Sequence, residues 1–179
     1  MKRLLIVTIL LCSINTFAQS DSGFSYTEFH EPKINLGYLI LGNFDVTYEY
    51  LLSEESGVGV NLMVPFDDYI EWNINYNLTG YYRFYFGDKR ADGFFGEAFA
   101  NLNNVEDRVN IEGSNPVQRR DKDITDLALG IAAGYKLVSN GGVVLEVFAG
   151  GGRNLFSEFN SERNFDFILR AGLNVGYRF

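Results

Sequence analysis

The stretch FDFILRAGLNVGYRF, residues 165–179, decides the fold. Every second residue from Phe165 to Phe179 is apolar, and the residues between them are polar or small except Ile168. A helix would scatter this apolar set around its surface, whereas a strand places it on one face. The sequence therefore predicts a strand with two unlike faces.

The same alternation recurs along the chain and predicts seven further strands and no helix. They cover residues 34–41, 44–51, 58–66, 74–86, 93–103, 125–138 and 143–152. The connections at 53–56, 87–92 and 139–142 are short, those at 67–73, 104–123 and 153–164 are long and polar, and the first, at 42–43, is an exception and tight. Short turns on one rim and long loops on the other are typical of transmembrane barrels. We expect an all-β fold, an eight-stranded antiparallel up-and-down transmembrane β-barrel.

Side-chain volume predicts which face points inward. An eight-stranded barrel has an interior only just wide enough for side chains. The apolar face carries many Tyr, Phe, Leu and Val residues, and the opposite face carries glycines and a few charges. We therefore expect the bulky face to contact lipid, although a soluble ligand-binding barrel with its apolar face inside is the alternative.

The N-terminus predicts export. Residues 1–18 combine Lys2 and Arg3, a short apolar run and a small residue, Ala18, which is the pattern of a signal peptide. We expect residues 19–32 to form a periplasmic leader and residues 33–179 to form the barrel. Removal of residues 1–18 leaves thirteen basic and twenty-three acidic residues, a formal charge of −10, and removes Cys12, the sole cysteine. This charge argues against nucleic acid as a partner.

Large aromatic residues concentrate where the strands meet the short turns. Such a ring is expected at a membrane interface. The predicted aromatic girdle consists of Tyr48, Tyr50, Phe84, Phe86, Phe94, Tyr135, Tyr177 and Phe179. Phe179 also ends the chain as an aromatic residue of an alternating strand, which resembles the C-terminal signal read by the barrel-assembly machinery of bacterial outer membranes.

Charged residues on the predicted inward face are balanced in sign. They are Glu49, Glu97 and Glu146 with Arg83, Lys136 and Arg170. Unpaired charge would be costly in such an interior, so we expect a paired network that fills it. A narrow pore or a proton path is the alternative.

The sequence offers little for catalysis or metal binding. The mature chain holds one histidine, His30, in the predicted leader, and no cysteine, so we expect no catalytic site, no metal site and no cofactor. The longest predicted loop, 104–123, contains Arg119 and Arg120, which could contact lipopolysaccharide phosphates or an external ligand. A solvated mixed-charge loop is the simpler interpretation.

The mature chain resembles small OmpA/OmpX-type eight-stranded outer-membrane barrels. It is more similar to a family of outer-membrane barrels of unknown function, through residues 81–86 (YYRFYF), 93–96 (GFFG), 129–136 (LGIAAGYK) and 146–155. These motifs are structural, so the resemblance implies fold and location and brings no catalytic residues. The very short first loop departs from the general pattern and leaves less surface there for an external partner.

Together these features predict an integral outer-membrane protein of a Gram-negative cell. We expect a non-enzymatic monomer with a structural or surface-interaction role. Its expected partners are outer-membrane lipid, lipopolysaccharide, the barrel-assembly machinery and an unidentified extracellular ligand. A narrow channel or a small-ligand-binding barrel is the alternative function.

Overall fold

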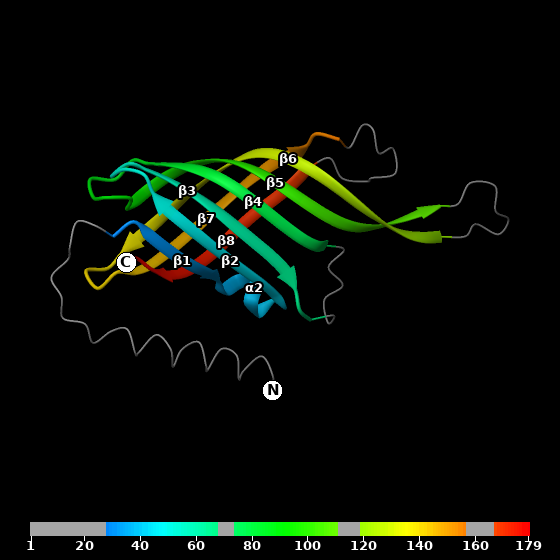
Figure 1. Ribbon diagram of the computed structural model, residues 1–179, viewed down its shortest axis with the longest axis horizontal. Coiled ribbons are helices and arrows are strands. Elements are labelled where there is room, and N and C mark those ends of the chain that lie inside the picture. Colours follow the sequence, from blue (N-terminus) through cyan, green and yellow to red (C-terminus); the bar gives the residue numbers. More distant parts are fainter. Residues whose placement is uncertain (1–27, 68–73, 111–118, 157–166) are drawn as a thin grey trace.

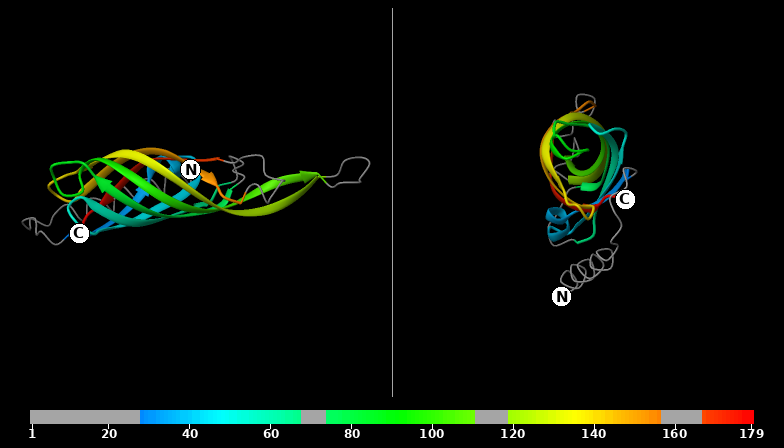
Figure 2. Two further views of the ribbon diagram at one scale, coloured as in Figure 1. Left: turned by 90° about the horizontal axis from the view of Figure 1, so that it is seen from above. Right: turned by 90° about the vertical axis from the view of Figure 1, so that its left-hand side faces the viewer.

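A computed structural model describes residues 28–67, 74–110, 119–156 and 167–179, with the side chains of 107–110 and 119–122 excepted. Within these ranges eight strands form a closed antiparallel barrel in which each strand pairs with its sequence neighbours and β1 pairs with β8 (Figures 1 and 2). The predicted fold class is therefore confirmed for the barrel itself. The strands are β1 (His30–Asn35), β2 (Asn43–Leu51), β3 (Ser56–Pro65), β4 (Ile74–Tyr85), β5 (Gly93–Asn110), β6 (Arg119–Val138), β7 (Val143–Asn154) and β8 (Phe167–Tyr177).

The first predicted strand, 34–41, is wrong beyond Asn35. The chain turns there into a short helix, α2 (Leu36–Ile40), so the expectation of no helix is also wrong. The Asn35 side chain caps α2 by accepting hydrogen bonds from the backbone of Gly37 and Tyr38, as helix N-caps do. Gly42 ends this segment with a φ of +84°, a left-handed conformation that glycine adopts without strain. Local capping thus overrides the apolar alternation.

The first strand also begins earlier than predicted. β1 starts at His30, three residues before the predicted barrel start at Lys33, and places Glu31 inside the barrel. The predicted signal peptide, residues 1–18, and most of the predicted leader lie outside the described residues. No helix in the described ranges is long and apolar enough to cross a membrane.

The longest predicted loop, 104–123, is largely a two-stranded ribbon. Glu106 pairs with Asp123 and Asn110 pairs with Arg119, so β5 and β6 extend together beyond the other strands (Figure 1). Alternation is lost here because a projecting ribbon has no lipid-facing side to make apolar. The backbones of β5 and β6 still pair here, but sequence periodicity cannot detect strands that lack the alternating pattern.

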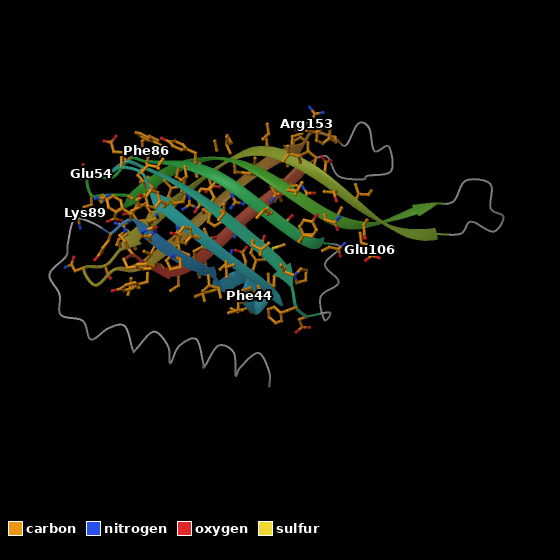
Figure 3. The ribbon with its side chains drawn as sticks, in the orientation of Figure 1. Phe44, Glu54, Phe86, Lys89, Glu106 and Arg153 are labelled. Carbon is orange, nitrogen blue, oxygen red and sulfur yellow. The ribbon has the colours of Figure 1, made fainter. Side chains whose placement is uncertain are left out.

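The two ends of the barrel differ as expected. The turns after β2, β4 and β6 are short and lie at the same end as the C-terminus (Figure 1). Glu54 and Lys89 mark this turn end, and Glu106 lies toward the opposite, ribbon end (Figure 3).

The barrel is inverted relative to a water-soluble domain. Its largest fully buried side chains include Arg83, Lys136 and Glu49, whereas Leu169 is 86% exposed and Ile131 is 73% exposed. Soluble proteins bury such charges rarely and only when they are paired. The interior is thus polar and the outer surface apolar.

Inward aromatic rings fit because glycines oppose them on neighbouring strands. Tyr81 lies opposite Gly59, and a Cβ on Gly59 would stand 2.3 Å from the Tyr81 ring. Phe99 opposes Gly130 in the same way. The predicted inward glycines are therefore present, but they accommodate large rings as well as filling a narrow space.

This packing predicts that Gly59→Leu lowers the thermal unfolding temperature of the folded protein in detergent. The added side chain would overlap the Tyr81 ring and force it out of the polar interior. Gly80→Leu is the matched control, because nothing lies within 4 Å of a Cβ at Gly80 on the neighbouring strand. Heat-modifiable gel mobility measures the unfolding temperature of both variants. Equal unfolding temperatures would contradict the proposed packing of the Tyr81 ring against Gly59.

Candidate functional site: a charged plug across the lumen

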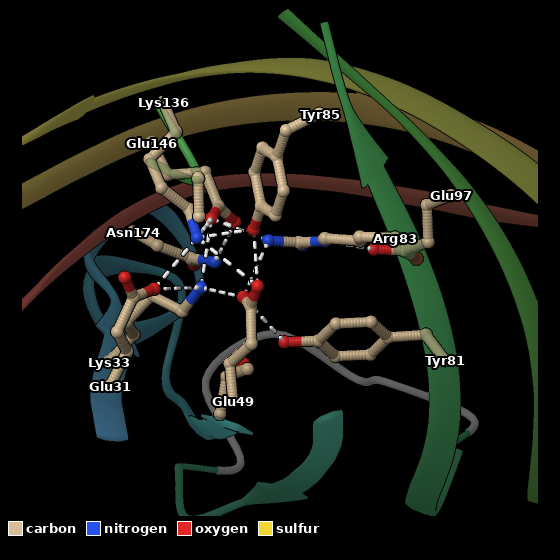
Figure 4. Close-up of polar contacts among 12 residues, drawn as sticks. Glu31, Lys33, Glu49, Tyr81, Arg83, Tyr85, Glu97, Lys136, Glu146 and Asn174 are labelled. Carbon is tan, nitrogen blue, oxygen red and sulfur yellow. Dashed lines mark hydrogen bonds and ion pairs between the residues drawn. The ribbon is translucent and has the colours of Figure 1, made fainter. Parts of the chain in front are cut away.

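The Glu49 carboxylate on β2 lies at the centre of an interior network of charges (Figure 4). It is fully buried, and groups from three other strands donate hydrogen bonds to it. The distances are 3.0 Å from Arg83 Nη1, 3.2 Å from Lys136 Nζ and 3.2 Å from Tyr81 Oη. Lys33 and the Tyr85 hydroxyl donate to the same carboxylate. A carboxylate with this many donors is well compensated for its burial.

Glu146 on β7 forms a second anionic centre beside the first. Its Oε2 accepts hydrogen bonds from Lys33 Nζ at 2.9 Å and from Arg83 Nη1 at 2.6 Å. The amide of Asn174 on β8 donates to its other oxygen at 2.9 Å. Lys33 and Arg83 therefore bridge Glu49 and Glu146 across the lumen.

Glu31 on β1 carries the network toward the turn end. It accepts from Lys136 Nζ at 2.7 Å and from Arg178 Nε at 2.6 Å. Arg178 also donates to the backbone carbonyls of Arg90 and Ala91, both at 2.9 Å. The turn between β4 and β5 is thereby tied to the end of the chain just after β8.

Glu97 on β5 carries the network toward the ribbon end. It accepts from Arg83 Nε at 2.7 Å and pairs with Arg170 from β8. The guanidinium of Arg83 lies 4.2 Å from the centroid of the Phe95 ring, and that of Arg170 lies 4.8 Å from the Phe99 ring. Guanidinium groups stacked on aromatic faces leave little room for water between them.

We call this ion-paired set the charged plug. Its four carboxylates and five cations are Glu31, Lys33, Glu49, Arg83, Glu97, Lys136, Glu146, Arg170 and Arg178. The structure brings together all six residues of the predicted interior network and adds Glu31, Lys33 and Arg178. The alternation of residues 170–178 already predicts that Arg178 faces inward. Glu31 was not predicted as an interior residue, because the predicted leader, residues 19–32, includes it.

The predicted girdle residues lie on the outer surface. Phe86 and Phe94 are 69% and 68% exposed at the turn end, five others are exposed to a lesser degree, and Tyr177 is half-buried. A second aromatic set, which the sequence pattern did not predict, lies toward the ribbon end. It consists of Phe44, Phe66, Phe156 and Phe167, all exposed.

His30 lies in β1 at the closing seam, not in a leader. Its Nδ1 lies 2.5 Å from the Tyr48 hydroxyl, and its ring stacks on Phe179 at 5.7 Å. The backbones of His30 and Phe179 exchange two hydrogen bonds of 3.0 Å. Phe179, the predicted assembly signal, thus continues the pairing of β8 with β1 beyond Tyr177.

The remaining candidates give no chemistry in the described residues. Arg119 and Arg120 lie on the β6 backbone, but their side chains are outside the described set. Within the described ranges, no group of three His, Cys, Asp or Glu residues is placed to hold a metal ion. The four carboxylates of the plug are each engaged by at least one cation.

The strand pairing defines the class of the protein, a closed eight-stranded β-barrel with a polar plugged interior and an apolar outer surface. A likeness of fold is found to the N-terminal β-barrel domain of Pseudomonas aeruginosa OprF, with 14% identity and a TM-score of 0.49 over 84% of this chain and 96% of that chain. No family model and no curated protein matches the sequence.

Loss of one central charge predicts a large loss of stability. Glu49→Gln keeps the shape of the side chain but leaves Lys33, Arg83 and Lys136 short of a carboxylate, and breaking a buried pair costs about 3–5 kcal/mol. Urea unfolding in detergent or bilayers measures the change in the free energy of unfolding.

Glu54→Gln in the exposed turn after β2 is the matched control and should change this free energy by less than about 1 kcal/mol. A Glu49→Gln protein as stable as this control would show that the plug does not hold the barrel together.

Proposed function

We propose that the chain is an integral outer-membrane β-barrel of a Gram-negative cell, sealed by its charged plug and acting without catalysis in a structural or surface-interaction role. The inversion of polarity carries the proposal. An outer surface on which Leu169 is 86% exposed and Ile131 is 73% exposed is stable only when hydrocarbon covers it.

The length of the apolar surface supports a membrane-spanning role. Phe167 and Tyr177 face outward near the two ends of β8, ten residues apart. This separation corresponds to ~33 Å along a strand and to ~25 Å across the membrane at a tilt of ~40°. An outer-membrane barrel has an apolar band of about this height between its aromatic girdles.

The plug supports a sealed barrel and not a channel. Seven of the eight strands contribute a charged or polar side chain to the network at Glu49, Glu97 and Glu146, and inward aromatic rings pack against its guanidinium groups. Ions crossing the lumen would have to break several buried ion pairs at once. The narrow-channel alternative is therefore disfavoured.

The ribbon supports interaction at the cell surface. β5 and β6 project beyond the other strands at the end opposite the short turns, which is the external side in outer-membrane barrels (Figure 2). In the proposal this ribbon, with Arg119 and Arg120, meets lipopolysaccharide or an extracellular ligand. The barrel-assembly machinery inserts the chain, which functions as a monomer.

Two measurements test location and sealing. We expect recovery of the protein in the outer-membrane fraction that needs detergent for extraction, and recovery from the periplasm or medium would contradict membrane insertion. In planar bilayers the purified barrel should give no stepwise single-channel conductance, since the plug fills the lumen. Regular conductance steps would favour the channel.

A charge on the outer surface should oppose insertion in a depth-dependent way. Leu173→Arg places a cation near the middle of β8, on the proposed lipid-facing side, and should make the free energy of folding into bilayers less favourable by ~2–4 kcal/mol. Leu52→Arg, just beyond the end of β2, is the control and should cost ~0–1 kcal/mol. Equal effects would indicate that Leu173 does not face hydrocarbon.

A further inference from the structure

The seam between β1 and β8 is incomplete toward the ribbon end. In this direction β1 pairs with β8 only as far as Asn35 and Asn174, and it pairs with β2 only as far as Val46. Among the described strands, none pairs with residues 167–173 of β8 on the β1 side or with residues 43–45 of β2 on that side. The helix α2 packs against β8 and β2 at this place instead.

The side chain of Asn35 connects α2 to β8. Asn35 caps the helix with its Oδ1, which accepts from Gly37 N at 3.1 Å and from Tyr38 N at 3.3 Å. Its Nδ2 donates to the Ala171 carbonyl at 3.4 Å, where a full strand would make a ladder of backbone bonds. This part of the wall is therefore held by side-chain contacts and can open without breaking a strand ladder.

A small polar cavity lies behind α2. Its volume is about 30 Å³, and its inner lining includes Asp45, Asn61, Thr79 and Asn101, all of which are buried. The same cavity also touches Leu169 and Ala171, whose side chains face outward and are exposed. The cavity therefore lies at the edge of β8 beside α2, next to residues that are exposed on the outer surface.

The lining defines what the cavity can hold. The carboxylate of Asp45 accepts a hydrogen bond from the Asn61 amide, and Arg170, the one cation of the lining, already pairs with Glu97, so an anionic head would find no unengaged cation there. Its volume suits a ligand group about the size of one or two water molecules. Leu169 of the lining is exposed on the outer surface, and Ile40 and Leu41 of the adjacent α2 segment are exposed and apolar.

We propose that this seam is a binding site for a single-chain amphiphile with a small, uncharged, hydrogen-bonding head, such as a fatty alcohol or primary amide. The head occupies the polar cavity, and the hydrocarbon chain leaves between β8 and α2 along Leu169 and Ala171. The proposal rests on the proposed function, because the ligand arrives from the lipid that surrounds the barrel.

Photolabelling of the refolded protein in phosphatidylcholine vesicles tests the proposal. The probe is a long-chain primary alcohol with a diazirine on its chain, and mass spectrometry locates the adducts. We expect adducts concentrated on residues 38–45 and 167–173, in excess over the outward residues of β3 such as Val60. Unlabelled hexadecanol should compete with the probe, and hexadecane should not.

Two matched variants separate a site from general lipid contact. Ala171→Phe adds a ring at the mouth of the cavity, and we expect it to reduce labelling there roughly tenfold. Ala149→Phe is the control, since Ala149 pairs directly with Ala171, is equally outward-facing and does not line the cavity. Both changes lie on the outer surface, so both proteins should fold.

The other possible outcomes contradict either the seam site or the proposed function. Labelling spread evenly over all outward residues, equal effects of the two variants, or equal competition by hexadecane would refute the seam site and leave membrane insertion intact. Absence of adducts on every outward residue would contradict the proposed function itself.

Discussion

The rest of the barrel depends on the compensation of buried charge around Glu49. Closing eight strands creates an interior too narrow for bulk water, and charges placed there must find partners from other strands. Every strand except β3 supplies a charged or polar group to the network around Glu49, Glu97 and Glu146. β3 supplies space instead, because Gly57 and Gly59 leave room for Glu49 and Tyr81.

This arrangement makes the interior, and not the exterior, the specific part of the fold. The outer face needs only apolar side chains of any shape, since lipid adapts to them. The inner face needs carboxylates, cations and aromatic rings at defined positions along the barrel axis. It also needs a glycine opposite each of the rings of Tyr81 and Phe99. Substitutions that conserve polarity but change volume should therefore be tolerated outside and harmful inside.

Sequence periodicity predicted most of the barrel because it reports a side chain's environment. Wherever one face meets the polar lumen and the other the apolar exterior, as along residues 125–138 and 143–152, the alternation is plain. It fails where that contrast ends. In the ribbon beyond Asn104 one face is polar and the other mixes Val105, Val109 and Ile124 with charged residues. At Asn35 a side-chain cap produces a helix in spite of alternating apolar residues.

The plug was predictable in kind but not in extent. Inward positions with charges of both signs imply pairing, and the six predicted residues do meet. Which carboxylate becomes central depends on the stagger of the strands, because partners such as Glu49 and Lys136 come from strands that are not neighbours in the sheet. Local sequence contains no record of that stagger. The hydrogen bond from Arg178 to the Arg90 carbonyl, in the turn after β4, also joins residues far apart in the sequence and is equally unpredictable from local pattern.

The position of the plug explains why the wall can be incomplete elsewhere. Its ion pairs join β1, β2, β4, β6, β7 and β8 in the part of the lumen where β1 is still a strand. Beyond Asn35 the sheet loses its ladder between β8 and β2. The strands that flank the gap remain tied on its turn side, because Glu49 of β2 and Glu146 both accept from Lys33, and Asn174 of β8 donates to Glu146. The ion pairs that stabilise the barrel and the proposed binding seam thus lie at different heights along the barrel axis. The charged half holds the cylinder closed, and the half with α2 is free to carry a weak seam.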